Sequence, residues 1–181
     1  MAIGDAENEG TLTGVERTFD RQDFIVSKTD LKGRITYGNR LFTDLSGYDY
    51  KTLIGAPHSL IRHPHMPRCI FKLMWDTIEA RKEIFAYVVN RCANGDHYWV
   101  EAHVTPTHNE QGAVNGYHSN RRVANPAVLQ DTIVPLYKGL LDIESGAPNR
   151  KEGMKRGFAA LQEILKKKGM AYDEFFFSLA G

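Results

Sequence analysis

Two short apolar runs open the ordered part of the chain. Residues 24–30 (FIVSKTD) and 32–39 (KGRITYGN) flank a polar stretch that contains Asp30 and Gly33. Apolar runs of this length around an Asp, Lys and Gly turn are typical of a β-hairpin. The pattern therefore predicts two antiparallel strands near the start of the fold.

Helical spacing follows the hairpin. Residues 39–48 (NRLFTDLSGY) and 49–55 (DYKTLIG) predict two short helices that each end at a glycine, and Asn39 is placed to begin the first. Apolar residues then recur at steps of three and four in 66–83 (MPRCIFKLMWDTIEARKE). This segment predicts a helix of about four turns with Pro67 in its first turn.

Three longer runs with strand character come next. They cover residues 84–92, 97–106 and 113–123, with turn residues between them. Strands in a meander, preceded by several helices, imply an antiparallel sheet with helices on one face and a hollow between the two layers. The sequence therefore predicts an α+β fold.

The chain is predicted to end in amphipathic helices. These cover residues 126–143 and roughly 149–180 and are split by SGAPN. Phe175, Phe176 and Phe177 lie near the end of the second helix, and one face of a lone helix cannot bury all three. They form either a docking patch for a partner or a contact with the sheet of the same chain.

Composition narrows the class of protein. The 181 residues are 42% hydrophobic and 25% charged with a net charge of +1, so neither disorder nor a nucleic-acid partner is indicated. We find no run of 18 apolar residues and no apolar leader, so we expect a soluble, cytoplasmic protein with no membrane insertion. Cys69 and Cys92 form no disulfide framework, which fits a reducing compartment.

Side-chain alternation gives the hollow a lining. In residues 97–104 the even positions, among them Tyr98 and Val100, share one face of the strand, and Asn90 shares the corresponding face of the strand before. Asn90 is thus the one amide on an apolar wall. A buried amide is costly unless it is paired, so Asn90 is the strongest polar candidate for binding a ligand.

Residues 57–68 (PHSLIRHPHMPR) carry three histidines, three prolines and two arginines. The prolines restrict the backbone, and Arg62 could meet an anion or pair with a surface carboxylate. His63 and His65 form an HxH pair, but no third ligand lies at a helpful spacing, so we expect no metal.

The combined motifs resemble one family. HSLIRHPHMP, NRCANGDHYWVEAHVTP and GYHSNR are similar to the flavin-binding PAS domain of bacterial aerotaxis receptors, and the similarity continues into PLYK at 135–138. It implies a PAS fold, with a five-stranded antiparallel sheet and short helices over a cofactor pocket. The expected organisation is an N-terminal arm or cap (1–21), a PAS sensor domain (22–123) and a C-terminal helical extension (124–181). Residues 1–14 are Gly- and acid-rich, so the arm is expected to be loose at its start.

The resemblance also implies a cofactor and a role. The domain would bind FAD noncovalently and report redox, oxygen or energy status to a signalling partner, such as a chemoreceptor-like protein or a kinase. Without the receptor's membrane segments it would be a stand-alone sensor and, like many PAS domains, a homodimer. No GxGxxG fingerprint and no nucleophile with its base can be traced, so we do not expect an enzyme.

Site residues follow from the pattern and the resemblance together. Arg62 and His63 would meet the pyrophosphate of FAD while Asn90 holds the ring at the opposite end. Asn39 is either a helix cap or a cofactor contact, and Trp75 either packs in the core or stacks on the ring. The expected cofactor-binding set is Asn39, His58, Arg62, His63, His65, Trp75, Ile84, Asn90, Tyr98 and Val100.

Two positions depart from the family and keep other occupants open. His65 stands where the family has Asp, and Ile84 where it has Trp. One alternative is a heme b sensor with iron bound by a histidine, since His58, His63 and His65 all lie near the pocket. The other is a cofactor-free PAS module for dimerisation or as an adaptor.

Overall fold

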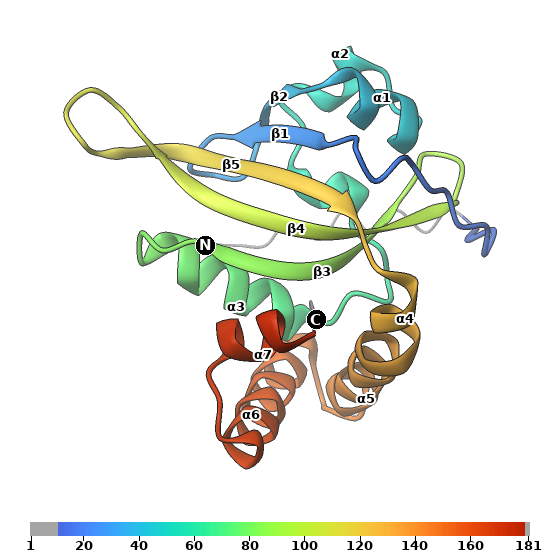
Figure 1. The fold of residues 1–181 in the computed structure, drawn as a ribbon, viewed down its shortest axis with the longest axis vertical. Coiled ribbons are helices and arrows are strands. Elements are labelled where there is room, and N and C mark those ends of the chain that lie inside the picture. Colours follow the sequence, from blue (N-terminus) through green and yellow to red (C-terminus); the bar gives the residue numbers. More distant parts are fainter. Residues whose placement is uncertain (1–10, 180–181) are drawn as a thin grey trace.

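The computed structural model describes residues 11–179, in which a curled antiparallel sheet separates two groups of helices (Figure 1). The strands are β1 (Ile25–Thr29), β2 (Ile35–Gly38), β3 (Ile84–Arg91), β4 (His97–His108) and β5 (Val114–Val123). Their order in the sheet is β2-β1-β5-β4-β3, and every neighbouring pair is antiparallel. The predicted α+β class and the five-stranded sheet are confirmed.

Four helical segments connect β2 to β3. They are α1 (Arg40–Ser46), α2 (Tyr50–Leu53), the single turn η1 (His58–Ile61) and α3 (Arg68–Glu79). Local sequence explains the first helix: the Asn39 side chain accepts the backbone N–H of Phe42, and Gly47 ends the helix in the left-handed conformation with φ of 73°. The predicted helices 39–48 and 66–83 are both present.

Strand register decides which side chains face inward. Asn90 on β3 lies opposite Tyr98 on β4, and Arg121 on β5 lies opposite Ala102. Because side chains alternate along a strand, these residues belong to one face of the sheet. This is the concave face that η1 and α3 cover.

The C-terminal region differs from the prediction in one place. Its helical segments are α4 (Pro126–Val128), η2 (Leu129–Ile133), α5 (Val134–Ser145), α6 (Arg150–Lys168) and α7 (Tyr172–Ser178). The single helix expected over 149–180 is wrong, because Gly169 adopts φ of 66° and ends α6. Its backbone N–H donates to the Leu165 and Lys166 carbonyls, a glycine C-cap that turns the chain into α7.

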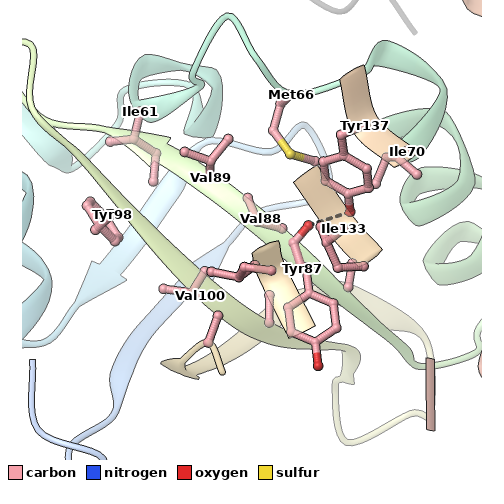
Figure 2. Close-up of a cluster of buried hydrophobic side chains, with 14 of the residues drawn as sticks. Ile61, Met66, Ile70, Tyr87, Val88, Val89, Tyr98, Val100, Ile133 and Tyr137 are labelled. Carbon is pink, nitrogen blue, oxygen red and sulfur yellow. Dashed lines mark hydrogen bonds between the residues drawn. The ribbon is translucent and has the colours of Figure 1, made fainter. Parts of the chain in front are cut away.

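Helices α5 and α7 cover the outer face of the sheet along β3. Phe175 and Phe176 are buried, and the Phe176 ring centroid lies 5.0 Å from that of Tyr87. The Tyr137 hydroxyl of α5 donates to the Tyr87 carbonyl oxygen at 2.6 Å (Figure 2). Of the two alternatives for the phenylalanine cluster, packing on the chain's own sheet holds for Phe176. Phe177 also contacts Phe85 of β3, with ring centroids 5.0 Å apart, although it stays 54% exposed.

The C-terminal helices are also tied to α3. Pro67, at the start of α3, offers no side-chain cap, and Glu144 of α5 supplies one instead. Its carboxylate accepts the backbone N–H groups of Arg68 at 2.9 Å and Cys69 at 2.8 Å. Gly153 of α6 permits this approach, since a Cβ there would lie 2.3 Å from the Glu144 carbonyl oxygen. Helices α3, α5 and α6 therefore meet at one point.

The segment before β1 docks on the turn between β3 and β4. The Thr13 hydroxyl and the Arg17 Nε both donate to the Asp96 carboxylate, at 2.6 and 2.8 Å. These hydrogen bonds hold the pKa of Asp96 at about 2. The arm is therefore docked from Thr13 onward. Its start, which was expected to be loose, lies largely in residues 1–10, outside the described residues.

Candidate functional site

A cavity of about 820 Å³ lies between the concave face of the sheet, η1 and α3. Its lining comes from β1, β3, β4 and β5 on one side, and from η1, α3 and Met154 of α6 on the other. The volume falls within the range of about 300–1,000 Å³ that is typical of sites for small organic ligands. The hollow that the strand pattern predicted is therefore present.

Asn90 places an amide on the sheet side of this cavity. The residue is 3% exposed, and its Nδ2 has no hydrogen-bond partner in the part of the chain that the structure describes. Its inward neighbours Val88, Ala102 and Val104 are apolar. A buried amide donor without an acceptor costs about 1–3 kcal/mol, so the site lacks an acceptor that a ligand can supply.

Arg121 is another buried polar residue of this wall, and it is also 3% exposed. Its Nε donates to the Ser119 hydroxyl at 3.1 Å, and its Nη2 donates to the Ser27 hydroxyl and to His58 Nε2, the latter at 2.7 Å. The guanidinium carbon lies 5.2 Å from the centre of the Phe42 ring. Its Nη1 has no hydrogen-bond partner among the described residues.

The surroundings of Arg121 are neutral. Burial, and then the nearby guanidinium, lower the pKa of His58 to about 3, so the imidazole is uncharged and its Nε2 can accept. Burial also lowers the pKa of Arg121, but a guanidinium remains protonated at any physiological pH. A buried charge that contacts hydroxyls, an imidazole and an aromatic ring is incompletely compensated.

Arg62 reaches the cavity from the segment after η1. Its guanidinium carbon lies 4.5 Å from the centre of the Phe71 ring, and its backbone forms an isolated antiparallel bridge with Asn90. The backbones of Arg62 and Asn90 therefore lie next to each other. The expectation that their side chains hold opposite ends of a cofactor stays a prediction.

Trp75 lines the cavity from α3. Its ring meets Tyr117 edge to face with centroids 5.5 Å apart, and a Cβ at Gly33 would lie 3.1 Å from Trp75 Cη2. Gly33 has φ of 75°, so the hairpin turn requires glycine there and the close approach of Trp75 makes use of it. The ring packs on its neighbours, as one of the two alternatives expected, and it also borders the cavity. Stacking of Trp75 on a cofactor ring stays a prediction.

Three of the expected polar residues do not line the cavity. The Asn39 oxygen accepts the backbone N–H groups of Phe42 and Val26, and its Nδ2 donates to the Phe24 carbonyl, so its hydrogen bonds serve the fold. His63 and His65 lie together with ring centroids 4.8 Å apart, and His65 is exposed. Neither histidine lines the cavity, whereas Arg62 of the same segment does.

Three apolar members of the expected set are also off the cavity wall. Tyr98 and Val100 are fully buried in the core, and Ile84 packs with Ile78 and Val104 in a smaller cluster. All three lie on the inward face of the sheet, as the alternation predicted. They are buried, and none of them lines the cavity. The expected residues that do line it are His58, Arg62, Trp75 and Asn90.

Sequence reasoning missed Arg121, Ser27 and Met154. A signal existed for Arg121, because the alternation that selects the inward residues of 97–104 also selects Ser119 and Arg121 in the paired strand. No local signal existed for Met154, whose place depends on how α6 packs on α3.

The donors of the site fit a flavin. An isoalloxazine ring offers carbonyl oxygens and ring nitrogens as acceptors along one edge, and the cavity presents the Asn90 amide and the Arg121 guanidinium, each with an unpaired N–H among the described residues. A heme fits less well, because His58 Nε2, the nitrogen that would bind the iron, is hydrogen-bonded to Arg121. Among residues 11–179 we find no group of three potential metal ligands and no helix able to cross a membrane.

Comparison with known proteins agrees with this geometry. Residues 35–120 match the family described as the PAS fold. The aerotaxis receptor of Escherichia coli K12 is 41% identical over 116 residues, which cover 64% of this chain and 22% of the receptor. The nitrogen fixation regulatory protein of Klebsiella pneumoniae is 31% identical over 97 residues, or 54% of this chain and 20% of that protein. The chain thus spans about a fifth of the length of these relatives.

Solved structures share the fold at lower identity. A light-oxygen-voltage domain studied with a flavin analogue aligns with a TM-score of 0.55 at 15% identity, covering 66% of this chain and 89% of that domain. A PAS domain from Colwellia psychrerythraea aligns with a TM-score of 0.51 at 22% identity, covering 56% and 86%. The family match over residues 35–120, the strand order and the helices over the concave face together show that this part of the chain has the PAS fold.

Proposed function

We propose that this protein is a PAS sensor that binds FAD noncovalently in the cavity and reports its redox state to a signalling partner. The observation that carries the proposal is the pair of buried donors, unpartnered among the described residues, on an otherwise mostly apolar cavity wall. Such donors need an acceptor-rich ligand. The similarity to an aerotaxis receptor supports a role in redox or energy sensing.

The proposed mechanism is a shift between two states of the protein. A bound flavin would supply electron-transfer chemistry, and reduction changes the charge and hydrogen bonding at its ring edge. Asn90 and Arg121 contact the ligand differently in the two redox states, and only such a difference can shift the equilibrium. Helix α3 lines the cavity and is capped by Glu144, so a shift of α3 reaches α5 and α6 directly.

The partner is part of the proposal. A chemoreceptor-like protein or a kinase fits the relatives, and we propose a homodimer as the working form. The role is that of a sensor without catalysis. A cytoplasmic location is proposed because Cys69 and Cys92 are free, buried thiols.

Absorption spectroscopy of the purified protein tests the cofactor. The expected spectrum has the two visible bands of a flavin, and FAD is then identified by chromatography after heat release. A Soret band would identify heme b and favour the alternative sensor. A colourless protein that does not take up FAD would favour a cofactor-free module for dimerisation or as an adaptor.

A binding experiment tests the signalling step. Affinity for an aerotaxis-type signalling partner is measured with oxidised protein and with dithionite-reduced protein under anaerobic conditions. The proposal expects at least a fivefold difference between the two dissociation constants, or about 1 kcal/mol. Equal dissociation constants would contradict the proposed reporting of redox state, but they would not contradict the proposed binding of FAD.

A further inference from the structure

We propose that Arg121 binds the flavin ring at N1 and the C2 carbonyl oxygen, and that its positive charge favours the reduced, negatively charged ring. The inference rests on the proposed binding of FAD. It gives the cavity a preference between redox states and assigns that preference to one residue.

Geometry places Arg121 far from the other free donor. Arg121 pairs with Ala102, Ala102 pairs with Ala86, and Asn90 lies four positions along β3 from Ala86. With about 4.8 Å between strands and about 3.3 Å per residue, the Cα atoms of Arg121 and Asn90 are roughly 16 Å apart across the wall. Because the two side chains start from different strands, a ligand would meet these two donors at different atoms, as the acceptors along a tricyclic ring allow.

Charge distribution assigns the ring, and not the phosphates, to Arg121. The guanidinium is buried among Ser27 of β1, His58 of η1 and Phe42 of α1, with the Tyr98 hydroxyl of β4 as the nearby titratable group. Two phosphate charges would lose their hydration at such a depth. Exposed cations at the cavity, Lys32 and Arg34, suit phosphates better because water still reaches them.

Reduction then creates the missing counter-charge. A flavin that takes two electrons from an external reductant and one proton from water at N5 carries one negative charge, shared by N1 and the C2 oxygen. Arg121 Nη1 is buried without a partner among the described residues and can donate a hydrogen bond to N1 or the C2 oxygen. In a site with little water, a cation a few ångströms from this charge stabilises the reduced form more than the neutral oxidised form.

The test compares the midpoint potentials of Arg121→Gln and Arg122→Gln. Arg122 is the matched control, since it lies on the same strand but is exposed and stacks over Phe24 on the outer face. We expect Arg121→Gln to lower the affinity for reduced FAD relative to oxidised FAD at least tenfold, which is about 30 mV for a two-electron couple. Arg122→Gln and the charge-retaining Arg121→Lys should stay close to wild type.

Riboflavin distinguishes a contact of Arg121 with the flavin ring from a contact with the phosphates of FAD. Because riboflavin lacks phosphate, a ring contact predicts that Arg121→Gln shifts its potential as it shifts that of FAD. A loss of affinity seen with FAD but not with riboflavin would move Arg121 to the phosphates and overturn the proposal. Equal potentials in Arg121→Gln and Arg122→Gln would also overturn it. Absence of flavin binding in the wild type would instead refute the proposed function.

Wild-type protein supplies a second measurement, should Arg121→Gln not fold. The potential of a two-electron couple changes by about 30 mV per pH unit for each proton taken up. An anionic reduced ring predicts one proton, and hence about 30 mV per pH unit, between pH 6 and 8. A slope twice as steep over this range would mean a neutral reduced ring and would contradict the role of Arg121.

Discussion

At the scale of single side chains, the cavity wall presents two buried hydrogen-bond donors that lack an acceptor among the described residues. Asn90 Nδ2 and Arg121 Nη1 are both unpaired among the described residues, and both are buried. Each is positioned by strand register and not by a flexible loop. The wall is thus rigid and prearranged, so little conformational entropy is lost when a ligand binds.

Removal of the Asn90 amide should weaken flavin binding. We expect Asn90→Ala to raise the dissociation constant for FAD about tenfold, the value of one hydrogen bond of about 1.4 kcal/mol. Fluorescence titration of the FAD-free protein measures this change. Asn115→Ala is the control, because Asn115 is exposed and pairs with Thr107 away from the cavity. An unchanged dissociation constant for Asn90→Ala would remove Asn90 from the site.

Two buried histidines predict a loss of stability in mild acid. Burial lowers the pKa of His58 to about 3 and of His63 to about 4, whereas both titrate near 6.5 when unfolded. Between pH 4 and 6.5 the unfolded chain therefore binds more protons than the folded chain. As a result, the free energy of unfolding falls as the pH drops from 6.5 to 4. Each histidine contributes a slope of up to about 1.4 kcal/mol per pH unit.

Urea denaturation of the FAD-free protein at pH 6.5, 5.5 and 4.5 measures this slope. His58→Gln keeps an acceptor for Arg121 and should flatten it. Asp96 does not interfere, because its pKa of about 2 confines its effect to pH values below 3.8. Constant stability across the three pH values would show that neither histidine is held neutral.

Residue-level prediction succeeded where alternation decides and failed where tertiary contacts decide. Asn90 could be found because one polar residue interrupts an apolar face. Arg121 was equally accessible by alternation in 113–123, but the cationic motif of 57–68 offered Arg62 as a competing anion ligand. His63 could not be placed from sequence, because the prolines fix the backbone without revealing which way a ring turns.

At the scale of elements, α3 is held by a contact that lies outside its own segment. Its first turn receives a carboxylate from Glu144, and the residues that make room for it are Gly153 and Gly157 of α6. A negative charge at the start of a helix is favourable because of the exposed N–H groups there. Three helices are thereby coupled at a single junction.

Paired glycine substitutions test this junction. A Cβ at Gly153 would lie 2.3 Å from the Glu144 carbonyl oxygen, so Gly153→Ala should lower the free energy of unfolding by about 1–3 kcal/mol. A Cβ at Gly139 of α5 would meet no atom of a neighbouring element within 4 Å, so Gly139→Ala should raise it by up to about 1 kcal/mol. Chemical denaturation of both variants measures the two changes, and a stable Gly153→Ala would mean that the helices are not tightly apposed.

The elements themselves were largely predictable. Strands 84–92, 97–106 and 113–123 and the helix of 66–83 correspond to β3, β4, β5 and α3. The end of α6 was missed although its signal was present, since Lys166, Lys167 and Lys168 before Gly169 have the pattern of a helix C-terminus. A continuing apolar pattern across Gly169 hid that stop.

At the scale of the whole molecule, β3 is covered on both faces. The cavity and α3 lie on the concave side, while α5 and α7 pack on the other through Tyr137 and Phe176. For Phe175, Phe176 and Phe177, the sequence could not decide between a docking patch for a partner and packing on the sheet of the same chain. That choice depends on contacts between residues far apart in the chain.

Signal output should follow the contacts from the cavity to α6. We expect reduction of the bound flavin to change amide hydrogen exchange in α3 and α6, whereas α2, which does not line the cavity, stays unchanged. Hydrogen exchange with mass spectrometry on oxidised and dithionite-reduced protein measures this. Changes confined to the sheet would contradict a route through α3.

The position of Met154 has a consequence for how the protein can be divided. Met154 belongs to α6, yet it closes part of the chamber that the earlier strands and helices shape. A fragment that ends after β5 would lack Met154 from the cavity wall and would expose Tyr87 to solvent. The C-terminal helices and the strands before them thus share one cavity, so a displacement of α6 would change the cavity wall at Met154.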